Sequence, residues 1–122
     1  MEIAVGIDVI EIDRVALAVE RWGKRFLERV YTQDELAYCR GRPDRLAARF
    51  AAKEAVMKAL GTGTRGVGWR EVEVVRKPGG QPTIVLHERA SRRAASLGFE
   101  SLSVSLSHSR AYAVASVVGS YS

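Results

Sequence analysis

The sequence predicts an α+β protein with a mostly antiparallel sheet packed with helices. Three observations carry this prediction: a strand pattern near the N-terminus, helical patterns through the first half of the chain, and two strand pairs with turn-forming connections in the second half. Separate groups of helices and hairpins are typical of this class. The 122 residues, 47% of them hydrophobic, suit one domain over residues 1–122.

The N-terminal strand is predicted over residues 2–10, with Asp8 on the face opposite a row of branched apolar residues. That apolar row consists of Ile3, Val5, Ile7 and Val9. A helical pattern then extends from Asp13 to Gly23. Residues 32–35 have the capping-box form, which predicts the start of another short helix.

The central segment, residues 46–60, is rich in alanine and other good helix formers and stops at Gly61. It predicts a helix whose apolar residues form one stripe, made of Leu46, Phe50, Met57 and Leu60. After it, residues 71–76 and 83–87 are predicted to form a hairpin around a turn rich in glycine and proline.

The last part of the chain predicts one more helix and a second hairpin. The helix covers residues 88–97 and ends at Gly98. Leucine and valine then alternate with serine over residues 102–107, a strand pattern. A tight connection near residues 108–110 leads to a final strand over residues 112–118.

The net charge of +5 favours an acidic partner, which could be nucleic acid, a phosphorylated small molecule or an acidic protein. The apolar runs are too short for a membrane span and no cationic leader is seen, so we expect a soluble cytoplasmic protein. Cys39 is the only cysteine, which excludes an internal disulfide and disfavours a structural zinc site.

Two carboxylates are candidate metal ligands. Asp8 lies within a strand pattern, where a buried carboxylate needs a cation or hydrogen-bond donors, so an ion pair and a metal site are both open. Glu54 and Lys58 are four residues apart on the central helix, which also suits an ordinary surface ion pair. Together the carboxylates could hold Mg²⁺, which prefers oxygen ligands and keeps substrate phosphates in its shell.

Cations repeat along the same helix. Arg45, Arg49 and Lys53 follow at four-residue spacing, so they would repel one another unless an anion offset them. Lys53 also falls within the apolar stripe, which indicates either a functional residue or a lysine that extends to solvent. His108, at a predicted strand end, suits a phosphate contact or a hydrogen bond to a turn carbonyl.

Three segments resemble the signatures of the acyl-carrier-protein-synthase type of 4′-phosphopantetheinyl transferase: residues 6–14, residues 49–63 and residues 105–109. The resemblance spans nearly the whole chain. It implies transfer of 4′-phosphopantetheine from coenzyme A to a serine of an apo acyl carrier protein, leaving adenosine 3′,5′-bisphosphate, in support of fatty acid biosynthesis.

The same resemblance implies roles for particular residues. Asp8 and Glu54 match the family's Mg²⁺ ligands, and Lys58 would offset charge on the leaving group. The general base would be a metal-bound water or Glu54. Besides Lys58, the residues expected near coenzyme A are Arg49, Lys53, Gly61, Thr62, Pro82 and His108.

The resemblance also implies how the chain meets its partners. The expected carrier-docking residues are Arg14, Arg25, Phe26 and Arg29. A solvated amphipathic helix is the other interpretation of these residues. A single copy of the module implies a homotrimer with active sites between subunits. The competing hypothesis is a catalytically silent basic module that binds nucleic acid or an acidic protein. Its tryptophans and tyrosines are scattered and not interleaved with the arginines as stacking platforms would be, so we do not expect nucleic acid as a partner. The short apolar runs likewise make a membrane an unexpected partner.

Overall fold

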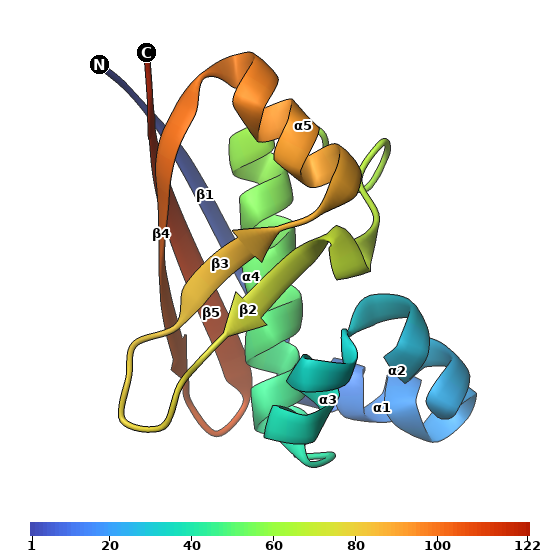
Figure 1. The fold of residues 1–122 in the computed structure, drawn as a ribbon. Coiled ribbons are helices and arrows are strands. Elements are labelled where there is room, and N and C mark those ends of the chain that lie inside the picture. The colour runs from blue at the N-terminus through green and yellow to red at the C-terminus, as the bar shows by residue number, and fades with distance from the viewer.

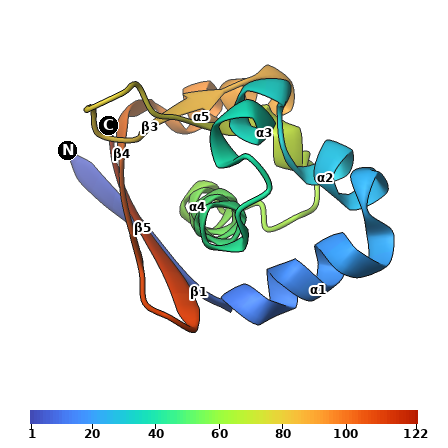
Figure 2. The ribbon, with the colours of Figure 1, turned by 90° about the horizontal axis from the view of Figure 1, so that it is seen from below.

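One long helix, α4 (Pro43–Leu60), lies at the centre of the computed structural model, which describes residues 1–122. Other elements surround this helix when it is seen end on (Figure 2). Of its 18 residues, 11 are buried. The prediction of one apolar stripe was therefore wrong, because alanines on several faces of α4 let neighbouring elements pack closely around it.

A three-stranded antiparallel sheet covers one side of α4 (Figure 1). Its strands are β1 (Glu2–Glu11), β5 (Tyr112–Tyr121) and β4 (Phe99–His108), in the order β1-β5-β4. All three predicted strands are confirmed, and β5 runs three residues further than the pattern indicated. Asp8 lies opposite Ala115 in the register, in the middle of β1.

A second, two-stranded antiparallel sheet consists of β2 (Val72–Val75) and β3 (Thr83–Leu86). A short 3-10 helix, Trp69–Glu71, precedes it, and α5 (Glu88–Leu97) follows it and ends at Gly98 in a left-handed conformation. The predicted α+β class with antiparallel pairing is confirmed, although the strands divide into two sheets.

Three helices lie between β1 and α4 in the sequence: α1 (Ile12–Trp22), α2 (Lys24–Val30) and α3 (Gln33–Cys39). The predicted capping box opens α3, where the Thr32 hydroxyl accepts from the Glu35 amide and the Glu35 carboxylate accepts from the Thr32 amide. The sequence pattern did not predict α2, because Gly23 marks the end of α1 without indicating that a new helix starts at once.

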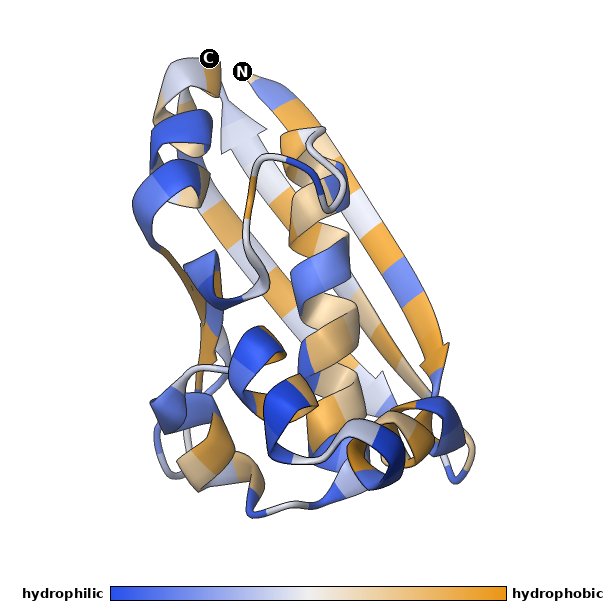
Figure 3. Ribbon diagram, turned by 90° about the vertical axis from the view of Figure 1, so that its right-hand side faces the viewer, coloured by the Kyte–Doolittle hydropathy of each residue, from blue (hydrophilic) through white to orange (hydrophobic).

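The core is a cluster of 23 buried apolar residues from all the helical and sheet layers. The outer face of β1, in contrast, is apolar and exposed, and Figure 3 shows hydrophobic residues at nearly every second position along this strand. These residues are 53–63% exposed: Ile3, Val5, Ile7 and Val9. None of the helices is long and apolar enough to cross a membrane.

Candidate active site

Gly6 brings β1 against α4. A Cβ atom at this position would lie 1.9 Å from the Ala55 carbonyl oxygen, so any larger residue would push the strand away from the helix. Asp8 is two residues along the same strand and therefore projects from the same face. The close approach at Gly6 is thus what places Asp8 beside the side chains of α4.

Asp8 and Lys58 form the best-defined contact of the site. The Lys58 Nζ donates to Asp8 Oδ1 at 3.0 Å and to the Ile7 carbonyl oxygen at 2.8 Å. The Lys58 side chain is half exposed, whereas that of Asp8 is largely buried. The structure therefore brings Asp8, Lys58 and, one helical turn before Lys58, Glu54 together, as the sequence predicted.

Glu54 lies in an unfavourable setting for its negative charge. Partial burial raises the pKa of its carboxyl, the Asp8 carboxylate raises it further, and Lys58 and Arg14 offset only part of that rise. The negative charge of Glu54 is therefore only partly offset by Lys58 and Arg14. The structure contains no group of three or more acidic, histidine or cysteine side chains that could hold a metal ion. Asp8 and Glu54 offer carboxylate oxygens, the kind of ligand that Mg²⁺ prefers.

An apolar cavity of about 340 Å³ adjoins Glu54. Arg14 lines this cavity. Three stacked aromatic rings form one wall of the cavity: the ring centroid of Phe50 lies 4.7 Å from that of Trp69 and 6.4 Å from that of Phe26. The predicted residues Arg14 and Phe26 therefore line the same cavity as Glu54.

Arg25, Phe26 and Arg29 also line a separate hollow of about 350 Å³ together with Trp22. Trp22 is an exposed aromatic residue between the two arginines. The four predicted docking residues are thus distributed over α1 and α2 around two neighbouring hollows that share Phe26.

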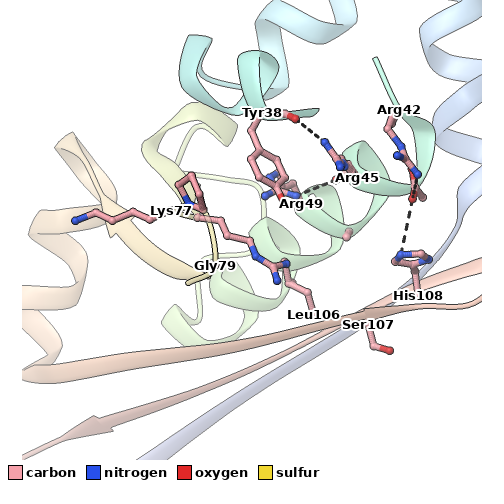
Figure 4. A pocket seen from close by; sticks show the side chains of 13 residues that line it. Tyr38, Arg42, Arg45, Arg49, Lys77, Gly79, Leu106, Ser107 and His108 are labelled. Carbon is pink, nitrogen blue, oxygen red and sulfur yellow. Dashed lines mark hydrogen bonds and ion pairs between the residues drawn. The ribbon is translucent and has the colours of Figure 1, made fainter. Parts of the chain in front are cut away.

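A second polar site, which we call the cationic pocket, lies at the N-terminal half of α4 and has a volume of about 430 Å³ (Figure 4). Its cationic side chains come from α4 and the segment before it, from the β2–β3 connection and from the end of β4. They are Arg42, Arg45, Arg49, Arg76, Lys77 and His108.

Arg49 is the unusual member of the cationic pocket. It is only 3% exposed, yet its Nε and Nη2 atoms have no hydrogen-bond partner. Its guanidinium carbon lies 4.1 Å from the centre of the Tyr38 ring, and that of Arg45 lies 5.0 Å from the same centre. A buried guanidinium with free donors is suited to bind an anion.

His108 borders the same pocket, as predicted. Its Nε2 is 3.7 Å from Asp44 Oδ2, and its Nδ1 is 3.4 Å from the Ser109 carbonyl oxygen. Asp44, the acidic residue in the pocket, is held by Arg42 at 3.3 Å. These contacts leave the half-exposed ring at the mouth of the pocket.

Lys53 is not available to bind a phosphate. It is 0% exposed, and its Nζ donates to Glu35 Oε1 at 2.7 Å and to the carbonyl oxygens of Trp69 and Val72. All three ammonium hydrogens are used. The predicted coenzyme A contact is therefore corrected to a buried ion pair that joins α3, α4 and β2, and the alternative of a lysine extending to solvent is wrong as well.

The remaining predicted residues lie apart from the cationic pocket. Gly61 ends α4 in the left-handed region, and the Thr62 amide donates to the Met57 carbonyl, at the opposite end of the helix from Arg45. Pro82 lies in the β2–β3 connection but does not line the pocket, which is instead bordered by residues 76–79 of that connection.

Sequence reasoning missed two partners in these sites. The repeated cations of the central helix indicated a place for an anion, but nothing in the local pattern marked Tyr38 as the ring beneath two arginines or Glu35 as the partner of Lys53. The capping box identified Glu35 from the sequence, but only as a residue that caps the start of α3.

Comparison with known proteins identifies the family of the chain. The sequence profile described as the 4′-phosphopantetheinyl transferase superfamily matches residues 4–117. A holo-[acyl-carrier-protein] synthase from Koribacter versatilis is 50% identical, over 97% of this chain and 98% of its own. One from Gloeobacter violaceus is 52% identical, over 93% and 89% respectively.

Solved structures give the same result. Helicobacter pylori holo-[acyl-carrier-protein] synthase in complex with coenzyme A matches with a TM-score of 0.86 and 32% identity, over 95% of this chain and 99% of that one. A Chronobacterium ammoniagenes complex of the synthase with coenzyme A matches with a TM-score of 0.87 and 29% identity, over 100% and 99%. The chain therefore belongs to the 4′-phosphopantetheinyl transferase superfamily, in its holo-[acyl-carrier-protein] synthase family.

Proposed function

We propose that this protein transfers 4′-phosphopantetheine from coenzyme A to a serine of an apo acyl carrier protein. The observation that carries the proposal is the grouping of Asp8, Glu54 and Lys58 in a chain half identical to holo-[acyl-carrier-protein] synthases. The coenzyme A complexes of its structural relatives support the donor, and the relatives' names support the acceptor.

Asp8 and Glu54 are the residues that would hold Mg²⁺. Their fit rests on the donor set: two carboxylates close enough for one to raise the pKa of the other, with open space beside Glu54 for substrate. The ion would neutralise phosphate charge and orient the pyrophosphate of coenzyme A.

The chain's own residues can account for the rest of the transfer. The carrier serine oxygen attacks the β-phosphorus, and the bond from that phosphorus to the bridging oxygen breaks as adenosine 3′,5′-bisphosphate leaves. Lys58, half exposed beside Asp8, is placed to offset the charge that develops on this leaving group. Glu54 is the chain's own candidate acceptor for the serine proton.

The two polar sites occupy opposite faces of α4, which supports an active site shared between subunits. Arg49 and Lys58 are nine residues apart, so they lie about half a turn apart around the helix and roughly 13 Å apart along it. One coenzyme A would contact the carboxylates of one subunit and the cationic pocket of its neighbour. The exposed apolar face of β1 gives the chain a surface for such association, and a homotrimer is our proposal.

The hollows of α1 and α2 are the proposed carrier-docking surface. Arg25 and Arg29 line this surface together with the exposed Trp22 and the half-buried Phe26, which suits an acidic partner with an apolar side chain to insert. We also expect one functional domain over residues 1–122, joined by its shared core, and a cytoplasmic location, consistent with the unpaired thiol of Cys39.

The activity is tested by mass spectrometry of an apo carrier protein incubated with this protein and coenzyme A. We expect the carrier to gain one phosphopantetheine in the presence of Mg²⁺ and none with EDTA. Asp8→Ala should lose the transfer, whereas Arg92→Ala, a change at an exposed arginine of α5 that lines none of the cavities described above, should retain it. If no carrier is modified by the unaltered protein, the proposed function is wrong.

Sharing of the active site is tested by mixing two inactive variants, Asp8→Ala and Arg49→Met, through co-refolding. If each site takes its carboxylates from one subunit and its cationic pocket from another, random assembly restores about one quarter of the activity. If each site lies within one chain, the mixture stays as inactive as its components, and the interfacial proposal fails.

A further inference from the structure

Tyr38 supports the buried guanidinium of Arg49 without using its hydrogen-bond donors. The guanidinium carbon lies 4.1 Å from the ring centre, a cation–π distance, while Nε and Nη2 remain unpartnered in a residue that is 3% exposed (Figure 4). Neither atom reaches a carboxylate. The third guanidinium nitrogen, Nη1, donates a long hydrogen bond of 3.5 Å to the Arg45 carbonyl oxygen, so the closer support for this charge is the Tyr38 ring.

The kind of group that lies against the Arg49 guanidinium determines whether this guanidinium remains free to bind an anion. A carboxylate partner would accept hydrogen bonds from the guanidinium and neutralise it, and an incoming phosphate would then have to displace that carboxylate. An aromatic face attracts the cation through its quadrupole and leaves the N–H groups in the guanidinium plane free. An aromatic support therefore favours binding of an anion in a way that an ion pair does not.

Tyr38 also orients Arg45, the next arginine along α4. Arg45 Nη1 donates to the Tyr38 carbonyl oxygen at 3.0 Å, and its guanidinium carbon lies 5.0 Å from the ring centre. Without this ring, two arginines four residues apart would repel each other and spread into solvent. The ring lets two like charges stand side by side at one wall of the cationic pocket.

We propose that Tyr38 is a positioning residue, whose ring pre-organises Arg49 and Arg45 to bind a phosphate monoester of the nucleotide substrate. This inference rests on the proposed function for the identity of the nucleotide. The ring need not touch the substrate. Its contribution is that the guanidinium groups are already oriented when the phosphate arrives, so less side-chain freedom is lost on binding.

The direct test is calorimetric titration of adenosine 3′,5′-bisphosphate into the assembled protein. We expect Tyr38→Leu to weaken binding about tenfold, as loss of a desolvated cation–π contact would. Tyr38→Phe keeps the ring and should bind within about twofold of the unaltered protein. In an Arg49→Met background, Tyr38→Leu should change affinity by less than about threefold, because the charge it supports is gone.

A merely structural role for Tyr38 would give a different result. Its loss would then lower the affinity for the nucleotide equally with or without Arg49. In the transfer assay, we expect Tyr38→Leu to raise the KM for coenzyme A and leave kcat within about twofold. If Tyr38→Leu disturbs the circular dichroism spectrum, Tyr38→Met, which also lacks a ring, takes its place.

The inference is overturned if the unaltered protein does not bind adenosine 3′,5′-bisphosphate, if the ringless variants bind it normally, or if the loss persists undiminished in the Arg49→Met background. These outcomes are distinct from failure of the proposed function. A protein that binds the nucleotide in the expected Tyr38-dependent way but modifies no carrier would refute the transfer activity alone.

Discussion

Replacement of Lys53 by methionine tests the corrected role of this residue most directly. The substitution keeps the length of the side chain and removes the ammonium group. It leaves the Glu35 carboxyl group, at 0% side-chain exposure, with only the amides of Thr32 and Val74 as donors. It also deprives two carbonyl oxygens, those of Trp69 and Val72, of their Nζ donor.

The expected loss is large relative to the stability of the domain. Removal of one partner from a buried ion pair destabilises a protein by about 3–5 kcal/mol, and domains of this size have only about 5–15 kcal/mol in total. We therefore expect Lys53→Met to lose about 4 kcal/mol. Adding Glu35→Gln to Lys53→Met removes the unpaired acidic group and keeps a side chain that can complete the capping box. We expect this double variant to recover about 2 kcal/mol of the lost free energy of unfolding.

The assay is urea denaturation at pH 7, at one fixed protein concentration because association contributes to stability. The matched control is Lys24→Met, which removes a lysine that is 87% exposed and 3.9 Å from Glu28, and should change stability by less than about 0.5 kcal/mol. A loss below about 1 kcal/mol for Lys53→Met, or no recovery in the double variant, would refute the reasoning. A raised KM for coenzyme A with unchanged stability would restore the binding role.

Three further predictions follow from the structure. Gly6→Val forces β1 away from the Ala55 carbonyl, so we expect loss of transfer activity together with a lower melting temperature, whereas normal activity would show that the close approach is unnecessary. Hydrogen bonds from Arg89 and two backbone amides lower the pKa of Glu71 to about 2 from 4.5, so its stabilisation is complete above pH 4.5 and disappears as the pH falls towards 2. Glu71→Gln should therefore lose about 2–3 kcal/mol at pH 7 in urea denaturation and progressively less at pH 4 and pH 3, and a loss independent of pH would contradict this. Arg25→Glu places a negative charge on the proposed docking surface, so we expect it to raise the KM for an acidic carrier at least about tenfold at low salt and to leave the affinity for coenzyme A unchanged. If the variant and the unaltered protein have the same KM for the carrier, Arg25 does not belong to the docking surface.

Much of the fold could be predicted because its signals are local. The capping box at Thr32, the glycines after α4 and α5, and the alternation in β1 and β4 each depend on residues close together in the sequence. The helix α2 was not predicted because its start depends on the backbone conformation at Gly23, and the presence of one glycine does not specify that conformation.

The carboxylates of the site could be named from the sequence, but mainly through resemblance to a family. Local reasoning left Asp8 open between an ion pair and a metal site, and the structure shows the ion pair with Lys58 beside a second carboxylate, a setting that suits both interpretations. The structure also places Arg49 and His108 in one pocket. Arg49 was a candidate because cations repeat along the central helix, whereas His108 was a candidate because it lies at a strand end in a segment that resembles the family.

What the sequence determined by itself was the order and type of most elements, the net positive charge and the three family segments. Only the tertiary structure decided which cationic side chains form ion pairs in the core and which keep hydrogen-bond donors without a partner. Lys53 is paired with Glu35, 18 residues away, whereas Arg49 rests on the Tyr38 ring with donors unpartnered. Both are cations on the same helix, and they differ because burial and partners come from elements that meet only in the folded chain.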